Sequence, residues 1–88
     1  MIVLKDTINA MISDDYKERF VAEYQQLIIR CKSLKAMLEK WDKSELDFTP
    51  TCPYGIYKIQ IEAMEHYIDI LETRAVIEDI DLQVINFG

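Results

Sequence analysis

The chain contains little glycine and proline, with two residues of each among 88, which argues against a disordered or loop-rich protein. Hydrophobic residues make up 50% of the sequence and charged residues 30%, as is typical of an ordered helical protein. We expect a single domain over residues 1–88. A core of this size buries only about 60 to 65% of the surface of the unfolded chain. Association of several copies would therefore add burial that one copy lacks.

Positive charge is also scarce, because ten Lys and Arg residues stand against 16 Asp and Glu residues, a net charge of -6. General nucleic-acid binding depends on clustered Lys and Arg side chains that neutralise phosphates. We therefore expect no nucleic-acid polymer as a partner. The charges are unevenly distributed, since residues 30–43 are mainly basic and residues 62–81 mainly acidic. Two adjacent helices with these charges would attract each other weakly.

The sequence has no apolar run near the roughly 20 residues that a membrane-spanning helix needs. Its first residues also lack the basic region that precedes the apolar core of a signal peptide. We expect no membrane contact and a cytoplasmic location. Cys31 and Cys52 are predicted to lie too far apart in the fold to form a disulfide. We expect them to be reduced thiols, which agrees with a cytoplasmic location.

Motifs for catalysis and metal binding are missing as well. His66 is the only histidine, and Glu62, Glu65 and Asp69 lie near it, but such spacings are common on solvated helix surfaces. No glycine-rich phosphate loop, nucleophile motif or zinc-ligand spacing is present. We expect no catalytic residue, no metal and no cofactor, and interpret the chain as a binding protein and not an enzyme.

The sequence does contain a strong helix signal. Ser13, Asp14 and Asp15 provide a capping hydroxyl and the acidic charge that the amino end of a helix favours. Apolar residues then recur at steps of three and four, which keeps one seam facing a partner helix. The seam consists of Phe20, Tyr24, Leu27, Cys31, Leu34, Leu38 and Trp41. This pattern predicts a helix over about 14–42, roughly 43 Å long.

Proline marks the turn into a second helix. Pro50 disfavours helical angles at the residue before it, so residues 43–52 are predicted to form a loop. Pro53 suits the first position of a helix, which we expect over about 53–79. A short strand-like run opens the chain, followed by one or two helical turns after Thr7. The predicted fold is all-α, an antiparallel two-helix hairpin with a short N-terminal helical segment and a tail at 80–88.

The second helix has two adjoining apolar stripes. One is predicted to face the first helix and consists of Tyr57, Ile61, Met64, Ile68, Leu71 and Ala75. The other consists of Ile56, Ala63, Tyr67 and Ile70 and is left partly exposed. Because monomeric proteins rarely expose large continuous apolar patches, the second stripe predicts that copies associate into a helical-bundle homo-oligomer. The apolar end of the tail is a further candidate for docking on a neighbour.

Polar residues border the apolar seams at the same spacing. We predict a ligand-binding set made of Tyr16, Arg19, Tyr24, Gln26, Arg30, Gln60, Tyr67 and Arg74. Arginine binds phosphates with a planar fork of donors, tyrosine stacks on bases or contacts riboses, and glutamine reads the edge of a base. A purely structural interpretation stays open, in which Arg19 pairs with Glu23, Arg74 pairs with Glu78, and Gln or Tyr side chains fix helix register.

Three stretches carry a family resemblance: SDDYKERFVAEYQQLIIR, LDFTPTCP and AMEHYIDILETRAVIEDIDL. They resemble a family of small accessory proteins found mainly in bacteriophages and named after a member in a crAss-like phage. The likeness covers about residues 4–82. Tyr54 and Gly55 depart from the leucine-rich start of the second helix in that family.

In size and hairpin architecture the chain is also similar to phage sponges that sequester cyclic nucleotides made by bacterial immune systems such as CBASS and Thoeris. The resemblances imply a phage protein in the cytoplasm of an infected bacterium. They imply that it sequesters a nucleotide immune signal, a cyclic dinucleotide or a cyclic ADP-ribose, without cleaving it. The alternative is an accessory protein that binds and blocks a host protein through its apolar and acidic helix face.

Overall fold

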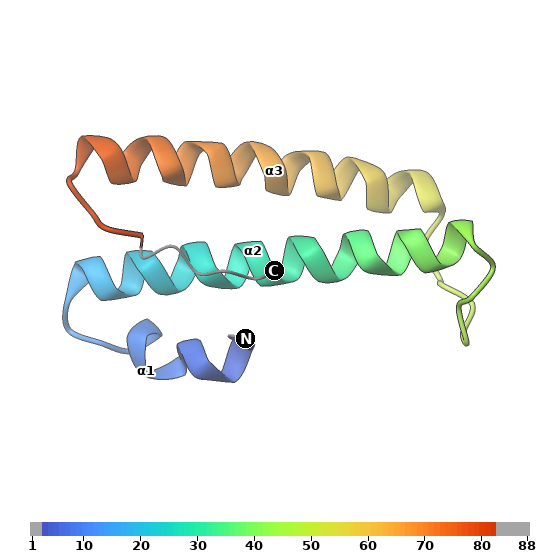
Figure 1. The fold of residues 1–88 in the computed structure, drawn as a ribbon, viewed down its shortest axis with the longest axis horizontal. Coiled ribbons are helices and arrows are strands. Elements are labelled where there is room, and N and C mark those ends of the chain that lie inside the picture. Colours follow the sequence, from blue (N-terminus) through green and yellow to red (C-terminus); the bar gives the residue numbers. More distant parts are fainter. Residues whose placement is uncertain (1–2, 83–88) are drawn as a thin grey trace.

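The computed structural model describes residues 3–82, and it is a helical hairpin with a short N-terminal segment. Its elements in chain order are η1 (Leu4–Thr7), α1 (Ile8–Met11), α2 (Tyr16–Asp42) and α3 (Tyr54–Ile77). The long helices α2 and α3 lie side by side and antiparallel, and the N-terminal segment runs back along the other side of α2 (Figure 1). The all-α hairpin predicted from the sequence is confirmed for these residues. None of them forms a strand, and Leu4 already begins a helical turn.

The helix boundaries differ from the predicted ones by one or two residues, and capping explains the differences. Asp15, not Ser13, is the N-cap of α2, because its Oδ1 accepts a 2.8 Å hydrogen bond from the amide of Lys17. Both long helices end where a residue adopts left-handed angles, Ser44 at φ 58° and Asp79 at φ 55°. After Asp79, the amide of Ile80 donates to the carbonyl of Ala75 at 2.8 Å, the bond of a Schellman motif.

The predicted seams of α2 and α3 form the core in two clusters. The first cluster contains Phe20, Leu71, Ala75 and Ile80, with Val21, Tyr24, Leu27 and Leu82 packed against it. The second contains Cys31, Leu38 and Ile61, with Leu34, Met37, Trp41, Tyr54, Tyr57, Met64 and Ile68 around it. Every residue predicted for the two facing seams belongs to one of these clusters. Ile80 and Leu82 of the predicted tail therefore pack within their own chain, and residues 83–88 lie outside the described part.

The contact between charged residues of the two long helices and the state of the two cysteines agree with the sequence-based expectations. Lys35 on α2 forms a 2.8 Å ion pair with Glu65 on α3, and because both side chains are 50% exposed the pair contributes little stability. Cys31 and Cys52 are free thiols, and burial raises the pKa of Cys31. Within residues 3–82, no helix is long and apolar enough to cross a bilayer.

The N-terminal segment is held on α2 by a buried polar contact. Thr7 is fully buried, and its hydroxyl donates to the carbonyl of Leu4 at 2.6 Å. Gln26 on α2 donates from Nε2 to Thr7 Oγ1 at 2.8 Å and also contacts the sulfur of Met11. Ala22 is completely buried one turn earlier on α2. Gln26, predicted as a ligand residue, therefore faces the N-terminal segment.

Replacing Gln26 with alanine is expected to loosen this segment and leave the hairpin folded, because the hydrogen bond to Thr7 contributes about 0.5 to 1.5 kcal/mol. Hydrogen exchange should become faster in residues 4–11 and remain unchanged in the middle of α2 and α3. Gln25→Ala is the matched control, since Gln25 makes no side-chain hydrogen bond with the described residues. Equal protection of residues 4–11 in both variants would contradict the expected role of Gln26.

Candidate functional site

Arg30 and Gln60 both line a groove of about 430 Å³ that is formed by η1, α2 and α3. Its walls are mainly apolar, with Leu4 from η1 and Leu34 and Met64 from the hairpin. Arg30 is exposed and makes no hydrogen bond or ion pair with the described residues. Its guanidinium is therefore available to an anion at the edge of an apolar groove, an arrangement common in small-molecule sites.

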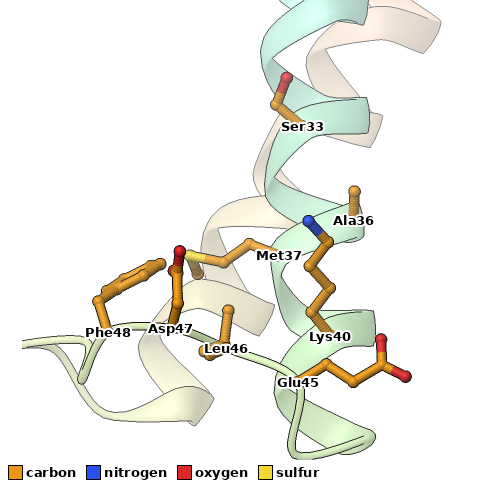
Figure 2. A pocket seen from close by; sticks show the side chains of 8 residues that line it. All are labelled: Ser33, Ala36, Met37, Lys40, Glu45, Leu46, Asp47 and Phe48. Atoms are coloured by element: carbon orange, nitrogen blue, oxygen red, sulfur yellow. The ribbon is translucent and has the colours of Figure 1, made fainter.

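A second groove of about 400 Å³ adjoins the first, and the two share Ser33 and Met37. Figure 2 shows Phe48 and Leu46 of the loop facing Met37 of α2 across this groove. The side chain of Lys40 extends along α2 on its other side, and its ammonium has no acceptor among the described residues (Figure 2). Together the grooves form a trough, with Arg30 at one end and Lys40 at the other.

The trough suits a ligand with two anionic groups. Arg30 and Lys40 are ten positions apart on α2, about 15 Å along its axis. Neither cation forms an ion pair in the described part of the chain, and apolar side chains lie between them, although Glu45 and Asp47 also line the groove at Lys40. Sequence analysis predicted Arg30 and Gln60 as ligand residues. It missed Lys40 and Phe48, because the loop that brings Phe48 against α2 carries no recognisable motif.

Tyr16 and Arg74 from the predicted set form a separate cluster at the open end of the hairpin. Arg74 donates from Nη2 to the Tyr16 hydroxyl at 2.9 Å and from Nε to Glu78 at 3.1 Å. The Tyr16 hydroxyl donates to Glu78 at 2.7 Å. The guanidinium carbon of Arg74 lies 4.9 Å from the ring centre of Phe20, within cation-π range. The predicted structural pair of Arg74 and Glu78 is thus present.

The electrostatics of this cluster follow from its hydrogen bonds. The bond from Tyr16 lowers the pKa of Glu78, and Arg74 adds to that effect. The pKa of Tyr16 is raised, chiefly by its bond to the Glu78 carboxylate. Glu78 offsets the positive charge of Arg74, so Arg74 attracts a free anion less strongly than Arg30 does. The Nη1 group of Arg74 has no acceptor within residues 3–82 and remains able to donate.

The other predicted residues lie apart from the trough. Arg19 donates from Nη1 to the carbonyl of Ser13 at 2.7 Å, in place of the predicted pair with Glu23. Tyr67 is 41% exposed on α3 and lines neither groove of the trough. Gln26 faces the N-terminal segment, as described above. The eight predicted residues are therefore spread over several places, and the trough contains two of them, Arg30 and Gln60.

Tyr24 joins the two long helices by donating from its hydroxyl to Glu72 Oε2 at 2.7 Å. Partial burial, together with this bond to a carboxylate, raises the pKa of Tyr24 to about 12. An ionised phenol would lose the bond and stand beside a negative charge. Tyr24 therefore serves the α2–α3 contact and keeps its proton at all physiological pH values.

The ultraviolet titration curve of the wild type, after subtraction of the curve of Tyr24→Phe, is expected to show one phenol ionising near pH 12. Because the folded pKa lies above the ordinary value near 10, the contribution of Tyr24 to stability is complete below pH 10. It is lost as the pH rises from about 10 through 12. Chemical denaturation should show wild type losing more stability than Tyr24→Phe over that interval. A difference spectrum centred near pH 10 would contradict the assignment.

No metal-binding group is found in the described part of the chain, in that no three His, Cys, Asp or Glu side chains come together there. The trough and the cluster at Tyr16 each bring together two of the predicted ligand residues. Both lie within or beside the hairpin formed by α2 and α3. The described part of the chain is thus a small helical hairpin with cations beside its grooves.

The family model for Sequestin matches residues 14–77, and the chain belongs to this family. The match includes all of α2 and α3, and it confirms the family resemblance found in the sequence. The family name indicates a protein that sequesters a partner. Comparison with curated proteins gives no match, and comparison with solved structures gives none.

Proposed function

We propose that this protein sequesters a nucleotide immune signal, a cyclic dinucleotide or a cyclic ADP-ribose, and retains it uncleaved as part of phage counter-defence. The observation that carries the proposal is the trough with unpaired Arg30 and Lys40 at its ends. The family name supports retention of a bound molecule over turnover.

The trough matches the chemistry of such ligands. Arg30 and Lys40 would each bind a phosphate, and Gln60 would contact the edge of a base. Phe48, which is 53% exposed, and Met37 offer apolar surface on which a base can lie. Two separated cations favour a ligand with two phosphates over inorganic phosphate alone, with Arg30 the stronger anchor because Glu45 and Asp47 line the groove at Lys40.

The test is a thermal-shift screen of the purified protein against cyclic dinucleotides and cyclic ADP-ribose isomers. One of these should raise the midpoint of unfolding by several degrees, because a ligand that binds only the folded state stabilises it. Mass spectrometry of the ligand released afterwards should show it intact. Absence of a shift with every nucleotide contradicts the proposal, and recovery of a hydrolysed ligand contradicts sequestration without cleavage.

A second candidate function is to bind and block a host protein through the apolar and acidic face of α3. It is favoured by the exposure of Ile56, Tyr67 and Ile70, which are 52%, 41% and 44% exposed. A pull-down from infected cells, repeated with Ile70→Glu, distinguishes the two candidates. Loss of one retained host protein in the variant, together with no nucleotide binding by wild type, would favour this candidate.

A further inference from the structure

One face of α3 carries an apolar stripe, interrupted at Arg74, that no described element covers. Only α2 contacts α3, and Figure 1 shows the opposite side of α3 free along its length. We call this face the outer stripe, and its members are Ile56, Ile59, Ala63, Tyr67, Ile70 and Ile77. All are exposed, and the large side chains among them are 41 to 77% exposed. A surface this apolar is rarely left to solvent.

We infer that the outer stripe of α3 pairs antiparallel with the outer stripe of a second copy of this chain, and that this pairing brings the partner's Arg74 to the groove beside Gln60. The inference rests on the proposed function for its ligand and on the structure for its geometry. Steps of three and four residues are those with which two helices pack over many turns.

The stripe is complementary to itself in the antiparallel direction. A two-fold axis between positions 66 and 67 sets Ile56 level with the partner's Ile77 and Ala63 level with the partner's Ile70. Small Ala63 opposite large Ile70 lets the two helices approach closely. Four of the six members, Ile56, Ala63, Ile70 and Ile77, are therefore matched by a reversed copy of the stripe, while Tyr67 lies level with the partner's His66.

Charge favours the antiparallel direction over the parallel one. An in-register parallel pair would place Arg74 beside the partner's Arg74, and like charges close together destabilise a helix pair. In the antiparallel pair, Ile59 lies level with the partner's Arg74, whose aliphatic stem can cover it. Gln60 is one residue further on, about 1.5 Å along the axis.

The contact at Gln60 completes the ligand groove. Gln60 lines the groove with Arg30, and the partner's Arg74 would approach from the mouth. Arg74 is 44% exposed, and its Nη1 group is unused within the described residues, so it can donate to Gln60 or to a bound phosphate. Each groove would then receive a second guanidinium from the neighbouring copy. Ligand binding and pairing would strengthen each other by this route.

The first experiment measures mass in solution by light scattering at micromolar concentration, for wild type, for Ile59→Glu combined with Ile70→Glu, and for Val76→Glu. Val76 is 83% exposed on α3 outside the outer stripe and serves as the matched control. Wild type and the control should have at least twice the mass of one chain, and the double variant should have the mass of one. A monomeric wild type overturns the inference, as does a double variant that keeps the wild-type mass.

The second experiment tests the direction of pairing by cysteine cross-linking in a Cys52→Ser background. Two copies of position 56 are about 31 Å apart in the antiparallel pair and adjacent in a parallel one. The Ile56→Cys variant alone should remain uncross-linked under mild oxidation, whereas an equal mixture with Ile77→Cys should form covalent dimers. Covalent dimers of Ile56→Cys alone would overturn the antiparallel assignment.

Nucleotide affinity then separates the inference from the proposed function. The double variant should bind the nucleotide that stabilises wild type at least about tenfold more weakly, with unchanged helix content. Unchanged affinity in a monomeric double variant removes the partner's Arg74 from the groove and leaves the proposed function standing. Pairing as described, with no nucleotide bound by wild type, supports the geometry and contradicts the proposed function.

Discussion

Arg30→Ala is expected to weaken nucleotide binding by about tenfold to 100-fold, the loss produced by removing one charge-assisted hydrogen bond worth about 1.5 to 3 kcal/mol. Arg30 is the guanidinium in the trough that has no partner among the described residues, so the unbound protein loses no contact. Isothermal titration of both proteins with the same cyclic dinucleotide measures the difference.

Two further variants show whether the loss belongs to the trough. Lys40→Ala should weaken binding in the same way from the opposite end, because Lys40 lines the adjoining groove. Lys58→Ala removes the same charge from a residue that lines neither groove and should leave the affinity nearly unchanged. Equal losses in all three variants would indicate general attraction of an anion and contradict a site at Arg30.

Leu71→Ala is expected to have the largest effect on stability, about 2 to 5 kcal/mol of unfolding free energy. Leu71 is fully buried between α2 and α3, in the cluster around Phe20, and the truncation leaves a cavity there. A chain of this size loses about 4 to 8 °C of unfolding midpoint per kcal/mol. Thermal unfolding followed by circular dichroism should therefore show a fall of about 10 °C or more.

Val76→Ala is the control on the same helix. Val76 is 83% exposed, so its truncation should change the unfolding free energy by less than about 0.5 kcal/mol. Comparable losses in the two variants would mean that the first cluster is not the stabilising core of the hairpin.

The hairpin was predictable from the sequence because one regular pattern determines it. Apolar residues at steps of three and four from Phe20 to Trp41 identify the packing face of the first helix, whichever helix packs on it. The loop that contains Pro50 allows the next helix in the chain to fold back onto this face. Exposure of Ile56 and Tyr67 on α3 followed from the same pattern. Helix ends were less predictable, since any of Ser13, Asp14 and Asp15 could serve as cap and only Asp15 does.

The candidate site was predictable only in part, because the type of a side chain does not determine which other side chains it contacts in the fold. Gln26 has the same spacing as Arg30, yet it is bound to buried Thr7 of a segment whose docking face left no sequence signal. The pair of Arg74 and Glu78 was the structural alternative, and it forms. Lys40 belongs to the mainly basic residues 30–43, and only the course of the loop beside it gives it a groove.

The position of Leu4 affects which part of the chain would determine the ligand preference of the groove. It forms one wall of the groove, but it lies outside residues 14–77, the part that matches the Sequestin family. The wall comes from a four-residue turn held to the scaffold largely through Thr7 and Gln26. If the proposed function holds, a change in this turn alone would widen or narrow the opening and alter the ligand preference, while the hairpin that matches the family model stays the same.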